Sequence, residues 1–541
     1  MAAHSLSLAS PPARASALAE LGALRLAPIL LACLTFVSHA YNMFSYPLYL
    51  GDEGIYMEQA WTVLKARGLT PYTYFYDHAP AGWILIAAWL RLLPHGVYQW
   101  GVAINSGRVL MLLLAVTSTV LLYRLASRLT GSSAAGFLAG VIFALSPLSL
   151  YYGRMVLLDN IMLFWLLVAL ALITDGDDLF AFFGGGAAFG VALLTKETAI
   201  FFAPVVIYAV YSNSKLRPFF RFALSGWSFL VLAVVSFYPL FALLKGELFG
   251  TDAFLLRAQG SHVNLLGAIQ WQLVARSVKA GSILHYANQS NGSFWDYYLH
   301  KWAFKDPVIL PLGLAATLFN VATGLARRDL RRTALTSAAL ALSYAYYLVR
   351  GAVLLEFYII PLLPFVALNI ALAAHTLLRF LPHRIALLAL VGIALATGIF
   401  FLKEHSASDA FSVQQTPLQV AQLAWVRAHI PTNAVVEIDD DLWTDLHDGA
   451  GSAFPVYLHA EPYSKIAGDP AVRRRDHITT WRDINYVVAS NQMGQVLKND
   501  TQDLTGIAQG AYLHSTVLAY WQLGGVRVEV RRVVPPSAPA R

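Results

Sequence analysis

The sequence predicts an α-helical, polytopic membrane protein with a small α/β domain at its C-terminal end. Of the 541 residues, 57% are hydrophobic and only 13% are charged, whereas soluble domains have roughly 25% charged residues. The mean hydropathy is +0.56, and polar residues become frequent only after about residue 403. The net charge of +7 falls largely in short loops between apolar segments, which indicates membrane orientation rather than nucleic-acid binding.

Apolar segments of about twenty residues can cross a bilayer core of about 30 Å as helices. We count about eleven, near residues 26–46, 101–123, 133–149, 157–174, 180–195, 197–212, 223–245, 307–326, 333–349, 357–379 and 385–402. Several are short, which suits a bundle with broken or re-entrant ends. The apolar segment 81–93 is shorter still and bounded by prolines, so we expect an interfacial helix in the first outer loop.

Lys and Arg lie in alternate loops, which fixes the expected orientation. They are Arg124, Arg128, Lys215, Arg217, Arg221, Arg327, Arg328, Arg331, Arg332, Arg379 and Arg384. All become cytoplasmic if the N-terminus is inside, as the positive-inside rule requires; the acidic loop 174–178 is the exception. We therefore expect a multi-pass protein of a bacterial plasma (inner) membrane, with an uncleaved signal anchor and the C-terminal domain outside.

The predicted domains are a cytoplasmic N-terminus (1–25), a transmembrane domain (26–402) and an extracytoplasmic α/β domain (403–541). The transmembrane domain carries a first outer loop at about 47–100 and a larger one at about 246–306. In the last domain we predict strands at 435–438, 486–489 and 526–534 and a helix at 416–429,. The single cysteine, Cys33, excludes an intrachain disulfide and a site of several thiolates,.

Two adjacent carboxylates, Asp52 and Glu53, follow the first apolar segment. Asp52 could cap a helix that starts near Glu53, and this structural interpretation is as frequent as a functional one. If the helix forms, Asp52 shares one face with Tyr56 and Gln59, which suits a sugar-binding site. Three more acids, at 439–441, follow a predicted strand where α/β domains often bind ligands; here we favour a solvated turn.

Four basic residues lie near the outer helix ends, where orientation does not require them. They are Arg108, Arg154, Lys196 and Arg350, and most have an acidic or aromatic residue close in sequence. Interhelical salt bridges are the alternative explanation for any single pair. Because all four converge on the face that carries Asp52, Glu53, Asp77 and His78, we expect a shared outward cavity.

The two kinds of charge suit different steps of one reaction. Carboxylates can take a proton from a hydroxyl, while Lys and Arg can hold a phosphate. Such a site at the lipid interface suits transfer of a group from a lipid phosphate to a hydroxyl. The aromatic residues at 72–76 and Trp83 suit a sugar face or a prenyl chain, and an interfacial aromatic belt is an equally frequent explanation.

Six segments, taken in chain order, resemble the polyprenyl-phosphate-dependent glycosyltransferases of the GT-C fold, which include protein O-mannosyltransferases and the lipid A aminoarabinose transferase. The segments are 50–56 with Asp52, 76–80 with Asp77 and His78, 106–110 with Arg108, 154–160 with Arg154 and Asp159, 194–197 with Lys196, and 357–364 with Tyr358. Ala79 stands where the family has the first of two prolines. The resemblance covers most of the membrane part and little of the C-terminal domain.

The resemblance implies a GT-C bundle and an inverting transfer of a sugar from a polyprenyl-phosphate donor. It implies Asp52 as the base, with Asp159 and Glu53 as the supporting acids. The implied substrate- and phosphate-binding residues are Lys196, Arg350, Arg108, Arg154, Asp77, His78 and Tyr358. The acceptor would be a hydroxyl or phosphate of a lipid, glycan or protein, and no nucleic acid takes part.

Three further points stay open. A divalent cation, Mg or Mn, could be held by Asp52 or Asp77 with His78, since carboxylate oxygens suit both metals. A transporter or lipid flippase is the alternative function, although the charges cluster at the outer helix ends rather than at the bilayer midplane,. A sensor whose bundle is only an anchor is a third.

Overall fold

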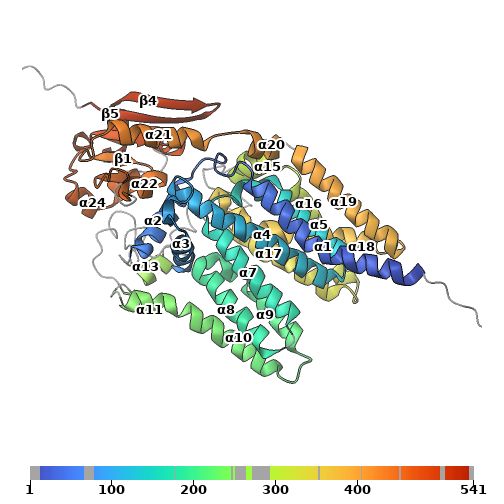
Figure 1. Ribbon diagram of the computed structural model, residues 1–541. Helices are drawn as coiled ribbons and strands as arrows, with labels where there is room; N and C mark the ends of the chain where they lie inside the picture. Colours follow the sequence, from blue (N-terminus) through green and yellow to red (C-terminus); the bar gives the residue numbers. More distant parts are fainter. Residues whose placement is uncertain are drawn as a thin grey trace, which may run out of the picture.

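The structure is a computed structural model in which a long helical bundle carries an α/β unit at one end (Figure 1). It describes residues 12–65, 78–176, 178–244, 246, 248–249, 264–270, 293–350, 354–403, 405–449, 453–499 and 506–534. The predicted aromatic segment 72–76, Asp77 and most of the larger outer loop lie outside the described residues. We call the end of the bundle beside the α/β unit the sheet end, and the other the far end.

Six helical segments in the described ranges are long and apolar enough to cross a membrane. They are α4 (Ala103–Thr130), α7 (Leu158–Asp175), α10–α11 (Phe220–Leu244), α16 (Ile309–Ala326), η5–α18 (Glu356–Leu378) and α19 (His383–Lys403). Shorter apolar helices occupy Leu26–Ala40 within α1 (Pro12–Ala40), α3 (Ala81–Leu92), α5 (Ser133–Leu145) and α8 (Leu179–Thr195). The remaining predicted spans contain α9 (Ala203–Ser214) and α17 (Arg331–Val349). Helix therefore occurs in every predicted segment, while the count of eleven spans stays a prediction.

Local sequence signals explain where the helices begin and end. The Ser132 hydroxyl and the Asp178 carboxylate accept backbone N–H groups at the starts of α5 and α8, as N-cap residues do. Gly131 ends α4 with φ +68°, a conformation that glycine adopts without strain. Four further elements connect these helices. They are α2 (Gly51–Leu64), η1 (Gly96–Tyr98), α6 (Pro147–Tyr152) and η2 (Glu197–Phe202).

The C-terminal unit is a five-stranded mixed sheet in the order β2-β1-β3-β5-β4. The strands are β1 (Val436–Ile438), β2 (Ala460–Pro462), β3 (Tyr486–Ala489), β4 (Ser515–Leu523) and β5 (Val526–Val533). β1 is parallel to β2 and β3, and β5 is antiparallel to β3 and β4. The three predicted strands and the helix α21 (Thr416–His429) are therefore confirmed, while β2 and β4 were not predicted.

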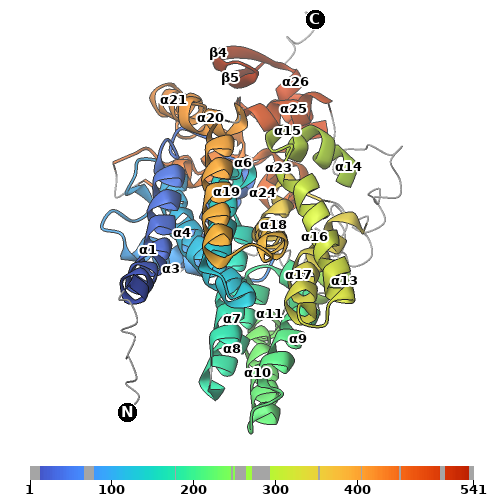
Figure 2. The same cartoon turned by 90° about the vertical axis from the view of Figure 1, so that its right-hand side faces the viewer.

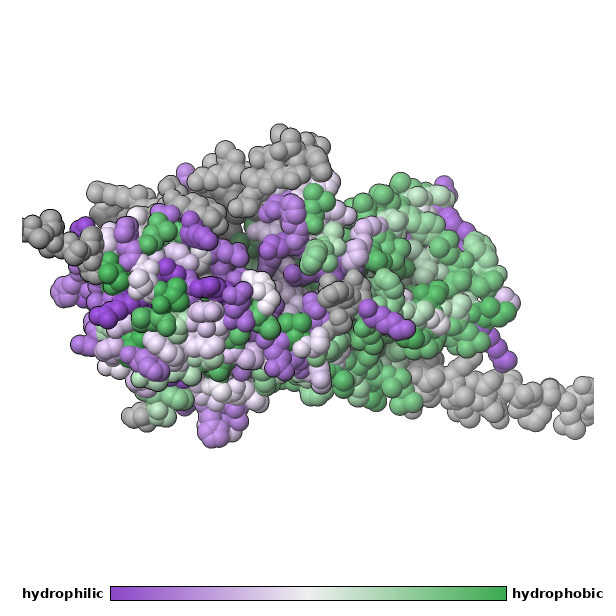
Figure 3. All heavy atoms as spheres, turned by 90° about the horizontal axis from the view of Figure 1, so that it is seen from above, coloured by the Kyte–Doolittle hydropathy of each residue, from purple (hydrophilic) through white to green (hydrophobic). Residues whose placement is uncertain are grey.

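Further helices complete the chain. Beside the sheet lie η6 (Asp440–Leu442), α22 (Trp443–His447), α23 (Tyr463–Gly468), α24 (Pro470–Arg475), η8 (Trp481–Asp483), α25 (Asn491–Asn499) and α26 (Gly506–Leu513). Between α11 and α16 lie α13 (Leu265–Gln270), α14 (Phe294–Tyr297), η4 (Tyr298–Trp302) and α15 (Ala303–Lys305), and α20 (His405–Ser412) follows α19. The bundle has a mainly hydrophobic surface, and the surface over the sheet is mainly hydrophilic (Figure 3), as expected for a membrane bundle with a solvent-exposed unit.

The sheet unit packs directly on α2, without an intervening linker. A Cβ atom at Gly54 would lie 2.1 Å from the backbone oxygen of Asp440, so only glycine allows this approach of η6. The Lys465 ammonium binds the Glu58 carboxylate at 2.8 Å, and the Trp61 indole donates to Asp448 at 2.6 Å. The helix α2 and the C-terminal unit therefore form one packed body.

We predict that Gly54→Ala destabilises the protein by about 1–3 kcal/mol through overpacking. Helix propensity alone would favour the alanine by about 0.8–1.0 kcal/mol. A loss of stability would therefore show that the close packing against η6 outweighs helix propensity. The measurement is thermal unfolding in detergent followed by tryptophan fluorescence. Gly392→Ala in α19 is the matched control, because nothing lies within 4 Å of a Cβ at that position; a neutral or stabilised Gly54→Ala would contradict the packing of η6 on α2.

Candidate active site

Asp52 is the second residue of α2, and its carboxylate is free of hydrogen bonds from the residues that the structure describes. The helix start is capped instead by Glu53, whose Oε2 accepts the Leu50 N–H at 3.1 Å. The prediction that Asp52 caps the helix is therefore wrong. Asp52 is half-buried, whereas Glu53 is completely buried, so Asp52 is the acid of the pair that a substrate can reach.

Glu53 forms a completely buried ion pair with Arg108. The guanidinium donates to both carboxylate oxygens, at 3.0 Å from Nε and 2.8 Å from Nη2. Both groups also form hydrogen bonds with the backbone. Glu53 Oε1 accepts the Val156 N–H at 2.9 Å. Arg108 Nη1 donates to the carbonyls of Met43 and Pro47, each at 2.9 Å. The pair thus ties α2 to α4 and to the segment before α7.

A second buried ion pair joins Lys196 to Asp159. The Lys196 ammonium lies 2.6 Å from Asp159 Oδ2 and 4.2 Å from the centre of the Tyr358 ring. Asp159 Oδ1 is buried and accepts no hydrogen bond within the described part of the chain. Asp159 stands in the first turn of α7, Lys196 follows α8 and Tyr358 belongs to η5, so three elements meet at this pair.

Burial raises the pKa of Asp52 to about 6 from the ordinary 3.8. The positive charges of Lys196 and His78 lower this pKa, and the negative charges of Asp159 and Asp439 raise it, by smaller amounts. These groups act on Asp52 because they lie around it, so the sequence-predicted Asp52, His78, Asp159 and Lys196 do come together at one site. A carboxylate of this pKa is ionised at neutral pH and accepts a proton more readily than an exposed one.

His78 lies beside η2 at the edge of this site. Its Nδ1 is 3.2 Å from Glu197 Oε2, and the Ala79 N–H donates to the other Glu197 oxygen at 2.6 Å. The His78 and Tyr56 rings are 6.3 Å apart. Glu197 therefore fixes the segment that enters α3. Asp77 lies outside the described residues.

The other two predicted cations differ in their surroundings. Arg154 is buried and donates to the carbonyls of Ala410 and Ser38, at 2.8 and 2.7 Å, so it ties α20 to α1. Arg350 lies over the rings of Phe201 and Tyr347, at 5.1 and 4.8 Å, and its buried Nε has no partner among the described residues. The buried Nε of Arg154 also has no partner among the described residues, but both of its terminal amino groups are bound to the backbone. The described residues form no hydrogen bond with the Arg350 guanidinium, so Arg350 is the more available of the two to a ligand.

The acids at 439–441 form the part of the site that the sequence did not predict. All three are buried, which contradicts the prediction of a solvated turn. The Asp439 carboxylate accepts the Ser490 hydroxyl, and Gln419 donates to Asp441 Oδ2 at 2.7 Å. Burial raises the pKa of Asp440 and Asp441 well above the ordinary value, so these side chains favour the neutral acid. Gly54 is the sequence signal that could have revealed the close contact.

An apolar cavity of about 290 Å³ lies between the helices α14, α16, α17 and α18 and the elements η4 and η5. It is lined by Phe294, Trp295, Tyr298, Trp302, Leu310, Pro311, Gly313, Leu314, Thr317, Ala341, Leu342, Ala345, Leu348, Val349, Ile359, Leu362 and Val366. Val349 and Ile359, which line it, are the chain neighbours of Arg350 and Tyr358. Its lining suits a hydrocarbon chain.

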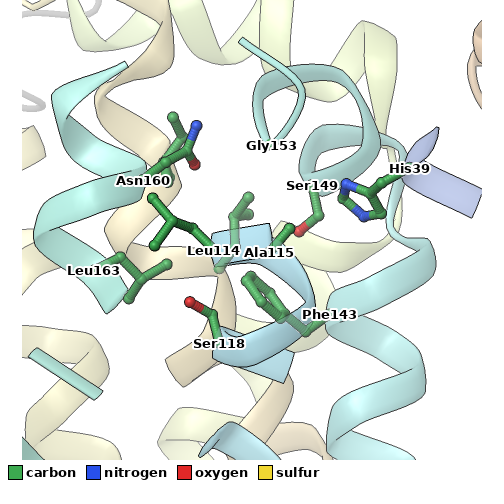
Figure 4. Close-up of a pocket in the computed structure, with 11 residues that line it drawn as sticks. His39, Leu114, Ala115, Ser118, Phe143, Ser149, Gly153, Asn160 and Leu163 are labelled. Atoms are coloured by element: carbon green, nitrogen blue, oxygen red, sulfur yellow. The ribbon is translucent and has the colours of Figure 1, made fainter. Parts of the chain in front are cut away.

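A smaller cavity of about 20 Å³ lies within the bundle, where His39 and Ser149 lie side by side (Figure 4). The His39 Nδ1 and the Ser149 hydroxyl are buried without a partner in the described ranges. Since roughly 10–15 Å³ holds one water, this cavity fits a structural water. Among the described residues no group of three or more His, Cys, Asp or Glu could hold a metal ion.

Part of the sequence is similar to known proteins. Residues 77–239 match the family model described as dolichyl-phosphate-mannose-protein mannosyltransferase. Two curated relatives, the polyprenol-phosphate-mannose–protein mannosyltransferases of two Mycobacterium tuberculosis strains (CDC 1551 / Oshkosh and ATCC 25618 / H37Rv), are 27% identical over 179 residues. The match covers 28% of this chain and 33% of each relative, so the chain spans about a third of the relatives it matches.

Solved structures with the same fold cover nearly the whole chain. ArnT from Cupriavidus metallidurans bound to undecaprenyl phosphate has a TM-score of 0.58 at 15% identity, over 96% of this chain and 99% of that one. The oligosaccharyltransferase AglB from Archaeoglobus fulgidus, with an inhibitory peptide and a dolichol-phosphate, has a TM-score of 0.56 at 13% identity, over 94% and 74%. The resemblance to the GT-C glycosyltransferases is confirmed: the chain is a multi-pass membrane protein with this fold.

We predict that Glu53→Gln lowers the free energy of unfolding by about 3–5 kcal/mol, because it leaves the buried Arg108 charge without its counter-ion. Glu197→Gln is the control, since the Glu197 side chain is 43% exposed and such pairs contribute about 0–1 kcal/mol. Both are measured by denaturant unfolding in detergent. Equal, small effects of the two substitutions would rule out the assigned role of the Glu53–Arg108 pair.

Proposed function

We propose that the protein is a glycosyltransferase that moves a sugar from a polyprenyl-phosphate donor to an acceptor hydroxyl, with Asp52 as the base. The observation that carries the proposal is the Asp52 carboxylate itself. It is half-buried, accepts no hydrogen bond from the described residues and has a pKa raised to about 6, within a fold shared with ArnT and AglB. The acceptor is a lipid, glycan or protein whose hydroxyl reaches Asp52.

The reaction proceeds by inversion at the anomeric carbon. Asp52 takes the proton of the acceptor hydroxyl, whose oxygen bonds to the anomeric carbon on the face opposite the phosphate. The bond between that carbon and the phosphate oxygen breaks, and its electron pair leaves with the phosphate. Cations replace the general acid that glycosidases use, because they stabilise the negative charge of the departing phosphate. Phosphate is also a better leaving group than an alkoxide, so the leaving oxygen needs no proton.

Arg350 and Lys196 are the cations that we assign to the phosphate. Tyr347 connects them: Arg350 lies over its ring, and its ring centre is 5.9 Å from that of Tyr358, over which Lys196 lies. Arg350 lacks a carboxylate partner in the described part of the chain, and Asp159 holds the Lys196 ammonium in place. The adjoining apolar cavity of about 290 Å³ suits the first isoprene units of the donor.

The other sequence-predicted residues receive positioning roles in this proposal. Glu53 and Arg108 have their polar atoms bound to each other or to backbone groups, and both terminal amino groups of Arg154 donate to backbone carbonyls. We therefore assign all three residues to the scaffold rather than to the chemistry. The basic residues of the far end support an orientation with that end in the cytoplasm. We therefore place the active site and the sheet unit on the extracytoplasmic side of a bacterial inner membrane.

We predict that Asp52→Asn lowers the transfer rate by roughly 10²–10⁴-fold, the usual contribution of a general base, and leaves thermal stability unchanged or raised. The assay follows release of polyprenyl phosphate from polyprenyl-phosphate mannose by purified protein, after mass spectrometry of the co-purified lipid has confirmed the donor. Asp178→Asn, at the far end of the bundle, is the control and keeps full activity. An Asp52→Asn protein with undiminished transfer would remove the base assignment.

We also predict that kcat/KM falls as the pH drops through about 6, because the raised pKa of Asp52 leaves a growing fraction protonated and unable to take a proton. Below that pH the rate falls by about tenfold per pH unit. Tryptophan fluorescence at each pH checks that the protein stays folded. A rate that is constant from pH 7 to pH 5 in folded protein would contradict a base with this pKa.

A further inference from the structure

A polar cavity of about 270 Å³ opens at the far end of the bundle. It is lined by Arg128, Leu129, Thr174, Ala209, Ser212, Asn213, Arg332, Thr333 and Thr336. These residues come from the ends of α4, α7 and α9 and the start of α17. Arg128 and Thr174 lie near the ends of α4 and α7, whereas Arg108 and Asp159 lie near the starts of the same two helices. The cavity is therefore distinct from the site at Asp52, and Figure 2 shows α9 and α10 on the side of the molecule away from the β4–β5 hairpin.

Two guanidinium groups line the cavity, and the structure fixes both. Arg128 Nε donates to Asp175 Oδ1 at 3.1 Å, and Arg332 Nη2 donates to Asn213 Oδ1 at 2.7 Å. Neither terminal amino group of Arg128 has a hydrogen-bond partner in the described ranges, and the side chain is 58% exposed. Each arginine is thus held by one bond and keeps further donors for a ligand.

The acidic groups near this cavity are already engaged. Asp175 is shared by Arg128 and Arg124, at 3.1 and 3.8 Å, and Asp178 accepts the Ala181 N–H as the cap of α8. The Thr174 and Thr333 hydroxyls donate to backbone carbonyls. The cavity therefore offers cationic donors and no free carboxylate among the described residues that line it, which selects for an anion.

Three other arginines at this end are bound elsewhere, and the Arg217 side chain donates to the Asn213 carbonyl at 3.1 Å. Arg331 donates to the carbonyls of Gly324 and Leu325, while Arg327 and Arg379 pair with Asp329. Membrane orientation accounts for all basic residues here as a group, but it does not require two of them, about 200 residues apart in sequence,, to line one cavity beside hydroxyl and amide groups.

We propose that this cavity binds a phosphate group between Arg128 and Arg332. Arginine binds phosphate oxygens through pairs of parallel N–H bonds, and basic pockets between membrane helices are suited to anionic lipid headgroups. The phosphate belongs to an anionic phospholipid of the adjacent leaflet or is free in solution, and the two sources are separated by experiment. The site does not depend on the proposed transferase activity.

The test compares lipid binding by the full chain and by Arg128→Gln/Arg332→Gln. Purified protein in nanodiscs of phosphatidylcholine, with or without phosphatidylglycerol, is unfolded thermally, and native mass spectrometry counts the phosphatidylglycerol that stays bound. The wild type is stabilised by phosphatidylglycerol and retains it, whereas the double variant loses the stabilisation and binds at least about tenfold more weakly. Arg327→Gln/Arg379→Gln removes the same charge from the same end and behaves as the wild type.

Inorganic phosphate at constant ionic strength forms the second arm. Stabilisation by phosphate and not by phosphatidylglycerol assigns the cavity to a free anion, provided that the Arg128/Arg332 variant abolishes it. Thr336→Leu narrows the cavity and leaves every charge in place. We expect it to abolish the stabilisation by the ligand as well, and it replaces the double variant in the test if that variant does not fold. Stabilisation by neither ligand, or an equal loss in the Arg327/Arg379 control, overturns the proposal.

Discussion

The buried ion pair between Glu53 and Arg108 is the interaction on which the architecture of the site depends. It uses all the strong acceptors of Glu53 and ties the start of α2 to α4, to the chain before α7 and to the carbonyls that precede the helix. Two charges removed from water are stable only when their hydrogen bonds are satisfied, and here they are. Because Glu53 supplies the cap, the neighbouring Asp52 is released from any structural role.

Three consecutive residues therefore serve three purposes. Successive residues of a helix point about 100° apart, so Asp52 faces the site, Glu53 faces the bundle and Gly54 faces η6, whose backbone would lie 2.1 Å from a Cβ. The same short segment carries the proposed base, caps its own helix and allows the close contact with the sheet unit. A substitution at any of the three acts through a different mechanism, and a loss of activity alone does not distinguish them.

The sequence predicted the membrane helices because apolar length is a local property, and it predicted β1, β3 and α21 from local periodicity. It predicted that Asp52, His78, Asp159 and Lys196 converge because orientation put them on one face. It failed where the outcome depends on which surface a segment meets. The acids at 439–441 are polar and follow a strand, as a solvated turn would. The fold buries them against partners distant in sequence, which are Ser490 and Gln419 within the C-terminal unit and α2, on which η6 docks. The sequence around Arg154 likewise does not indicate that its guanidinium group donates hydrogen bonds to two backbone carbonyls.

The docking of the sheet unit also bears on the chemistry of Asp52. Burial is the main cause of its raised pKa, and Asp439, which directly precedes η6, adds a negative charge that raises it further. A general base works best when its pKa lies near the working pH, since it must be ionised and still accept a proton. The C-terminal unit thus does more than cover the membrane bundle: through Asp439 it contributes to the raised pKa that suits Asp52 to the proposed role of base.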